Sequence, residues 1–287
     1  MPSCSNLACQ SHGAKGTAWC VKAGYYKPKE SGQRTARFKC KACGKTFSSN
    51  TQKPTAYQKK RSINGRLFEL LVSGVSLRRA AELLEVEYNT VLLHFDYLAK
   101  AAKTHHAKFL LSIETEFVQV DELETFIHAR PKCVSVAMAV RVKTGQILGF
   151  NIARMPANGK LAAVGVSKYA WTVDERRAKF QAMLSSFSEC LKPSITFKTD
   201  SNTNYAKWIA AVVPHAKLEQ IKGKSKKQPA GTPKGYDELF ATNNTFARMR
   251  HDMNRLARKT WSTSKAIHGL EKHLWLYLAW NNKYKLK

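Results

Sequence analysis

The hydrophobic pattern of the chain changes at residue 116, and no other feature constrains the fold as strongly. From this point apolar residues occur in short runs or alternate with polar ones, which is typical of β-strands. Three strands are predicted, over residues 117–126, 132–143 and 146–154. Because residues 143–145 form only a short turn that contains glycine, we expect the three strands to pair as an antiparallel meander.

Helices and strands alternate after the meander. Residues 172–175, Thr-Val-Asp-Glu, have the pattern of a capping box and predict a helix that continues to about Leu191 and is ended by Pro193. A fourth strand over 195–199, a helix over 203–213, a fifth strand over 217–221 and a final helix follow. This order of elements resembles the ribonuclease-H-like fold of retroviral integrases, and it implies an α/β catalytic domain.

Two aspartates lie at the ends of predicted strands. Asp121 belongs to the first strand and Asp200 ends the fourth, and in the fold named above such residues lie side by side. Strand alternation turns Glu122 and Glu124 to the other face, so they are poorer candidates. Each aspartate could instead bind backbone N–H groups, Asp200 as a helix N-cap. Together the two indicate a site for divalent metal ions that act on a phosphodiester bond.

The net charge of the chain is large and positive. Its 48 Lys and Arg residues stand against 20 Asp and Glu residues, which gives +28 at pH 7. Such an excess favours a polyanionic partner, above all double-stranded DNA, over a merely solvated surface. A membrane-surface protein is disfavoured because no basic amphipathic helix or lipidation signal is clear. No secretory signal or bilayer-spanning run is evident, so a cytoplasmic protein is expected.

Four of the seven cysteines form two close pairs near the N-terminus. Pairs on two separated turns allow four thiolates to surround a tetrahedral Zn²⁺, and four protein ligands imply a structural ion. The alternatives are four unrelated buried cysteines, or His12 in place of one thiolate. Cys20, Cys133 and Cys190 are expected to be packing residues. The predicted zinc ligands are Cys4, Cys9, Cys40 and Cys43.

Three short helices are predicted next, over residues 63–72, 77–84 and 89–99. Ser73-Gly74 ends the first helix and Ser76 caps the second, which is the spacing of a helix-turn-helix whose last helix enters the major groove. An ordinary three-helix bundle is the alternative. The residues expected to face DNA are Arg78, Arg79, Asn89, Thr90 and His94.

Residues 237–282 carry the most specific resemblance. The stretches that begin Asp237-Glu-Leu-Phe-Ala-Thr-Asn243, Asn254-Arg-Leu-Ala-Arg-Lys and His273-Leu-Trp-Leu-Tyr resemble the closing helices of bacterial insertion-sequence transposases. The group is the one allied to the smallest bacterial insertion elements, and the likeness extends over nearly the whole chain. It implies a multidomain α+β protein, with a zinc ribbon at 1–50, a helix-turn-helix at 51–104 and a ribonuclease-H-like catalytic domain at 105–287.

The resemblance also implies an activity and its residues. Such an enzyme binds the inverted repeats at the ends of its element, cleaves DNA with two Mg²⁺ or Mn²⁺ ions and joins the freed end to target DNA. Asn243 stands where most relatives carry a glutamate, so a ligand charge is missing there. Arg250 lies seven residues after Asn243, on nearly the same face of the predicted helix, and is expected to hold a DNA phosphate; a plain surface arginine is the alternative.

The family implies assembly at least as a dimer on paired ends, close to the bacterial nucleoid. Two rivals stay open: a non-catalytic DNA-binding regulator derived from a transposase, and a structure-specific nuclease of the same fold. Further basic residues expected on DNA are Lys224, Lys226, Lys227, Arg255, Arg258 and Lys259.

Overall fold

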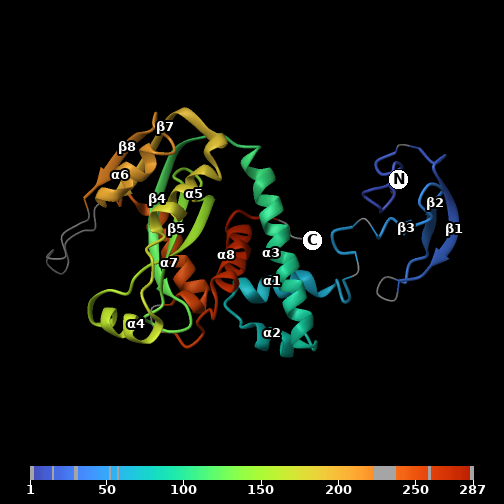
Figure 1. Ribbon diagram of the computed structural model, residues 1–287, viewed down its shortest axis with the longest axis horizontal. Helices are drawn as coiled ribbons and strands as arrows, with labels where there is room; N and C mark the ends of the chain where they lie inside the picture. Colours follow the sequence, from blue (N-terminus) through green and yellow to red (C-terminus); the bar gives the residue numbers. More distant parts are fainter. Residues whose placement is uncertain are drawn as a thin grey trace. The chain divides into compact units, whose positions relative to one another are not determined.

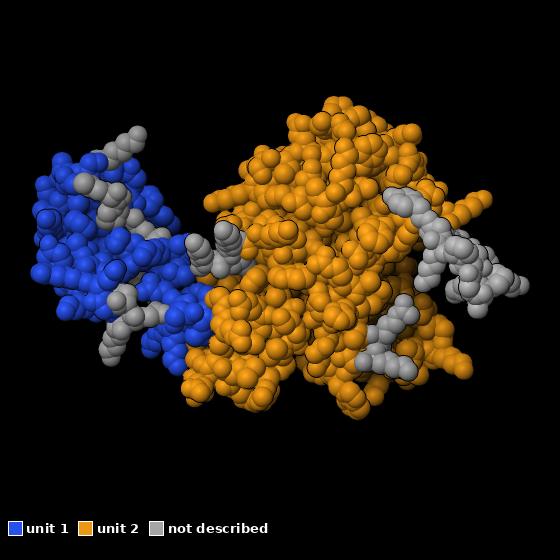
Figure 2. Space-filling model, turned by 180° about the vertical axis from the view of Figure 1, so that it is seen from behind, with its two compact units in different colours: residues 1–64 blue, residues 65–287 orange. Residues whose placement is uncertain are grey.

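The structure, a computed structural model, describes residues 3–14, 16–28, 32–51, 53–56, 58–222, 237–257 and 260–284. The chain forms two compact units, residues 1–64 and residues 65–287 (Figure 2). The predicted residues Lys224, Lys226, Lys227, Arg258 and Lys259 lie outside the described part of the chain.

The first unit contains a small antiparallel sheet. Its strands are β1 (Cys20–Tyr26), β2 (Thr35–Cys40) and β3 (Thr46–Ser48), in the order β1-β2-β3. Phe47 is the largest buried side chain, and the rings of Trp19 and Phe38 stack on it with centroids 5.3 and 5.9 Å away. Because this apolar core is so small, most of the fold must be held by other means.

The second unit is built on a five-stranded sheet in the order β6-β5-β4-β7-β8 (Figure 1). The first three strands in sequence pair antiparallel, as predicted; β7 then pairs parallel with β4, and β8 pairs parallel with β7. The bounds of the strands are β4 (Thr115–Phe126), β5 (Cys133–Arg141), β6 (Ile147–Arg154), β7 (Leu191–Asp200) and β8 (Lys217–Ile221).

Helices cover both faces of this sheet. One face packs on α5 (Arg176–Ser185) and α6 (Thr203–Ala210), and the other packs on α7 (Phe240–Asp252) and α8 (Ile267–Asn281). The alternation of β4 explains the two cores: Val118 and Val120 enter the first, whereas Leu123 enters the second. A shorter helix, α4 (Ala162–Tyr169), and three single turns complete the unit: η1 (Gly159–Leu161), η2 (Ser188–Cys190) and η3 (Asn254–Leu256).

Three helices precede the sheet: α1 (Ile63–Val72), α2 (Leu77–Leu83) and α3 (Tyr88–Leu110). The predicted cap is confirmed, because the Ser76 hydroxyl accepts a hydrogen bond from the Arg79 N–H at 3.2 Å. Gly74 ends α1 at φ +79°, and a Cβ there would lie 2.7 Å from the Asp252 carbonyl oxygen. Only glycine meets both requirements, the positive φ and the close approach of another backbone.

These three helices share a core with α8. Leu276 and Ala279 of α8 pack among the buried residues of α1, α2 and α3, and Asp96 pairs with Lys272 at 3.0 Å. The boundary predicted after residue 104 falls inside α3, which runs without a break to Leu110. The helical segment therefore belongs to the same compact unit as the sheet.

Two local predictions were wrong. The segment 172–175 does not form a capping box, because Glu175 instead accepts a hydrogen bond from the Arg154 N–H at 3.0 Å, and α5 ends at Ser185 rather than near Leu191. Pro193 lies within β7 and not at a helix end. The strand tolerates a residue without an N–H here because the pairing of β7 with β4 is interrupted between Leu191 and Thr196.

Candidate active site and metal centre

Asp121 and Asp200 lie on the same face of two neighbouring parallel strands. The register pairs Gln119 of β4 with Lys198 of β7, and each aspartate follows two residues later on its strand. Side chains two residues apart share a face, so both carboxylates point to the α7 side of the sheet. The register thus brings Asp121 and Asp200 to corresponding positions on neighbouring strands, each two residues beyond the last pair.

The surroundings of Asp121 disfavour its charged form. Burial raises the pKa of Asp121 to about 6, and the nearby charges of Asp200 and Glu122 act in the same direction. One oxygen of Asp121 accepts the Glu122 N–H at 2.7 Å, and one oxygen of Asp200 accepts the Asn202 N–H at 3.0 Å. Asp121 therefore binds a backbone N–H, as considered from the sequence, whereas Asp200 is not the helix N-cap considered there, because Asn202 caps α6.

Tyr205, which was not predicted from the sequence, lies close to Asp121 and Glu122. Tyr205 is 1% exposed, and its hydroxyl donates a hydrogen bond to Glu122 Oε2 at 3.2 Å. Hydrogen bonding between Tyr205 and Asp121 opposes the rise in the pKa of Asp121. Glu122 also accepts a hydrogen bond from the Ser135 hydroxyl at 2.6 Å. Because Glu122 is fully engaged on the α5 and α6 face, it is a structural partner of the site and a poor candidate for holding metal.

Gln119 attaches the start of α7 to this face of the sheet. Its side-chain nitrogen donates to the Glu238 carbonyl at 2.6 Å, and its oxygen accepts the Thr242 N–H at 3.0 Å. Gln119 is 2% exposed, so the loss of either bond would leave a buried polar group unpaired. The sequence signal that could have predicted this contact is a glutamine on the same face of the strand as Asp121, two residues earlier.

Asn243 follows Thr242 on α7 and is exposed. Its Nδ2 donates to Asp237 Oδ2 at 3.0 Å, which orients the amide and leaves Oδ1 as the atom able to bind a cation. Asp237, in the turn before α7, is thereby held beside Asn243. Arg250 lies on the same helix and is half-buried.

The predicted DNA-facing residues divide into two sets. Arg78, Arg79 and Asn89 are exposed and Thr90 is half-buried, so all four have access to solvent. His94 was wrongly assigned, because it is 1% exposed and belongs to the buried stripe of α3. Its neighbours on that stripe, spaced by three or four residues, are Val91, Phe95 and Leu98.

The prediction that Arg255 contacts DNA was also wrong. Its guanidinium donates to the Ser264 hydroxyl at 3.0 Å, and burial lowers the pKa of Arg255 to about 10. The side chain therefore stabilises the connection between α7 and α8 and does not stand ready for a phosphate.

The four predicted cysteines converge in the first unit. Their sulfur atoms all lie within 4.8 Å of one another, with Cys4 and Cys43 3.5 Å apart and Cys9 and Cys40 3.8 Å apart. Backbone N–H groups of Cys43 and Ala42 lower the pKa of Cys40 to about 6, which favours the thiolate that a metal requires. His12 instead bonds the Cys4 carbonyl oxygen through Nδ1 at 2.7 Å.

This cluster could hold a metal such as zinc, and its chemistry fits one. Four converging sulfur donors in a unit with a minimal core are typical of a structural tetrahedral site. Gly44, at φ +70°, makes the turn that follows the second pair. Within the described residues, the four cysteines are the only group of three or more His, Cys, Asp or Glu side chains placed to share a metal.

No protein-family model matches the chain, and no curated protein matches it either. In the part of the chain that the structure describes, every helix is too short or too polar to cross a membrane. The site's residues and their geometry therefore carry the functional argument.

Proposed function

We propose that the protein is a DNA transposase whose second unit is a ribonuclease-H-like catalytic domain. The observation that carries this proposal is the placement of Asp121 and Asp200 on one face of adjacent parallel strands, beside the helix that bears Asn243. The sheet order β6-β5-β4-β7-β8, with an antiparallel meander followed by two parallel strands, supports the fold assignment.

The proposed catalytic ions are Mg²⁺ or Mn²⁺. Asp121, Asp200 and the Asn243 side chain supply oxygen donors, which are the ligands that these hard cations prefer. Bound there, the ions would activate the attacking oxygen and stabilise the leaving oxygen of a phosphodiester. The protein's own part is to keep both carboxylates on one face through the strand register and to hold α7 against that face through Gln119.

The remaining parts of the chain fit DNA binding. A net charge of +28 favours contact with phosphates, and the exposed ends of α2 and α3 present Arg78, Arg79 and Asn89. The cysteine cluster would hold the first unit together as a zinc ribbon. By analogy with such enzymes, at least two copies would act on a pair of element ends.

A cleavage assay tests the proposal. The protein is incubated with DNA that carries the inverted repeats flanking its gene, in Mg²⁺ or Mn²⁺, and the products are examined for 3′-end nicks and for joining to a target. Asp200→Asn should abolish both products while leaving DNA binding intact. Glu124→Gln is the matched control, because Glu124 is an exposed acid on the opposite face of β4, and it should retain activity.

One observation favours a second candidate, a DNA-binding regulator without catalysis. The third position carries Asn243, which adds no charge to the metal site, and its amide is already bonded to Asp237. Specific binding to the repeats with no nick in either metal would support the regulator and overturn the transposase. Nicking without strand joining would instead point to a nuclease.

A further inference from the structure

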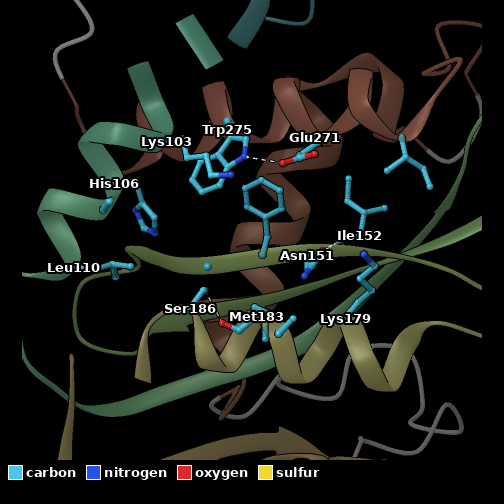
Figure 3. Close-up of a pocket in the computed structure, with 15 residues that line it drawn as sticks. Lys103, His106, Leu110, Asn151, Ile152, Lys179, Met183, Ser186, Glu271 and Trp275 are labelled. Carbon is cyan, nitrogen blue, oxygen red and sulfur yellow. Dashed lines mark hydrogen bonds between the residues drawn. The ribbon is translucent and has the colours of Figure 1, made fainter. Parts of the chain in front are cut away.

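The second unit contains a cavity of about 350 Å³ beside the outer edge of β6. Figure 3 shows side chains from four elements around it: Lys103 and His106 of α3, Asn151 and Ile152 of β6, Lys179 and Met183 of α5, and Glu271 and Trp275 of α8. The cavity lies at the far edge of the sheet from β7 and β8, and the proposed catalytic residues do not line it.

The strand edge at this cavity is already occupied by side chains. Asn282 bonds both backbone groups of Ile147, accepting from its N–H at 2.9 Å and donating to its carbonyl at 2.8 Å. Nε2 of His106 lies 2.8 Å from the Leu148 carbonyl, and Asn151 accepts the Ile152 N–H at 2.9 Å. These groups cannot also pair with an added strand, so most of this edge is closed to strand addition.

The apolar side of the cavity is aromatic. The rings of Phe150 and Trp275 have centroids 4.9 Å apart at 58°, and Met183 lies on the opposite wall. Trp275 is held in place because its Nε1 donates to Glu271 Oε1 at 3.3 Å. A fixed indole beside a second ring offers a surface for a flat, unsaturated group.

The polar side of the cavity has two cations and one anion. Lys103 of α3 and Lys179 of α5 both line the cavity, and neither has a carboxylate within ion-pair distance among the described residues. Lys103 Nζ lies 5.9 Å from the centre of the Trp275 ring. Glu271, the one acid in the lining, has a second oxygen that can accept a hydrogen bond from an occupant.

We infer that this cavity binds a single nucleoside monophosphate unit, either as a free nucleotide or as an unpaired residue of a DNA strand. The base would lie against Phe150 and Trp275, with its amino or imino N–H donating to Glu271, and the phosphate would lie between Lys103 and Lys179. A simple aromatic or aliphatic carboxylate fits less well, because it has no N–H donor for the Glu271 carboxylate. The inference stands independently of the cleavage reaction.

Chemical protection of the two lysines tests the inference on the full-length protein. Lysine acylation is followed by mass spectrometry with and without dAMP, with an oligonucleotide that has a single-stranded end, and with a blunt duplex of the same sequence. We expect dAMP or the single-stranded end to protect Lys103 and Lys179 while Lys108, an exposed lysine of α3 outside the cavity, stays reactive. Protection by dAMP alone identifies a free nucleotide, and stronger protection by the single-stranded end identifies a DNA residue.

Substitutions of residues that line the cavity test whether dAMP binds there. Calorimetry should show that Lys179→Glu weakens dAMP binding by about fivefold or more, because the substitution replaces a half-buried attractive charge with a repulsive one. Glu271→Gln, which keeps an acceptor for Trp275, should change the preference between bases. Lys108→Glu serves as the charge-matched control and should bind normally. Equal dAMP affinity in the Lys179 and Lys108 variants, equal protection of all three lysines, or no protection by either ligand overturns the inference.

Discussion

Replacing Asp121 by asparagine is expected to stabilise the metal-free protein at pH 8. Burial is the main reason that the pKa of Asp121 rises from 3.8 to about 6. Above pH 6 the folded protein must therefore carry a carboxylate that would ionise more easily in the unfolded chain. Asparagine has the same shape, can still accept the Glu122 N–H, and carries no charge.

The size and sign of the effect follow from that shift. Each pKa unit corresponds to about 1.4 kcal/mol, so a shift of about two units destabilises the folded state by about 3 kcal/mol above pH 6. Because the folded pKa is raised, the penalty is absent below the unfolded value of 3.8 and grows as the pH rises to about 6. The gain of Asp121→Asn should thus be about 3 kcal/mol at pH 8 and close to zero near pH 4.

Urea unfolding in Mg²⁺-free buffer measures this directly, with tryptophan fluorescence as the probe. Thermal unfolding in the same buffer gives a second measurement. For a domain of this size, the melting temperature at pH 8 should rise by about 6–12 °C after the substitution, since each kcal/mol shifts it by about 2–4 °C. Adding Mg²⁺ should stabilise the wild type and leave Asp121→Asn unchanged. Glu124→Gln should alter neither. A gain that is the same at pH 4 and pH 8, or no gain at all, would falsify the assignment of Asp121 as a buried carboxylate held for a cation.

Three further outcomes are expected. Cys40→Ser should abolish zinc binding, measured by metal content, and should make residues 1–64 selectively sensitive to limited proteolysis. Retained zinc and a protease-resistant first unit would contradict the four-thiolate site. Gln119→Leu should lower the free energy of unfolding in urea by about 1–3 kcal/mol and increase amide exchange at the start of α7, because the Thr242 N–H and the Glu238 carbonyl lose their partner. Unchanged exchange there would show that other contacts hold α7. Gly74→Ala should cost about 1–3 kcal/mol, since its φ of +79° and the Asp252 carbonyl at 2.7 Å both oppose a Cβ; a neutral result would mean that the α1 turn relaxes freely.

Much of the local structure was predictable because it depends on neighbouring residues. The alternation of apolar residues located β4, β5 and β6, and the cap at Ser76 located the start of α2. The two close pairs of cysteines predicted the sulfur cluster, since chelation requires only short turns that bring the pairs together. The face shared by Asp121 and Asp200 also followed from strand alternation.

Errors arose where distant segments decide the environment of a residue. His94 was assigned to DNA because helix propensity does not reveal which face packs on α8, where the rings of His273 and Phe95 are in contact with centroids 4.5 Å apart. Arg255 looked like part of a basic surface, yet Ser264, nine residues away, turns it inward. The length of α3 was underestimated because its second half is stabilised by contacts such as that of His106 with Leu148.

The sequence by itself determined the charge, the two close pairs of cysteines and the order of the strands in the second unit, because these depend on residue type and short-range spacing. Only the tertiary structure decided which groups meet: Gln119 with Thr242, Tyr205 with Glu122, and the four walls of the cavity beside β6. Those contacts join residues that can be more than a hundred positions apart. Their free energy comes from burying apolar surface between whole elements and from pairing the polar groups buried with it, and no local pattern encodes that.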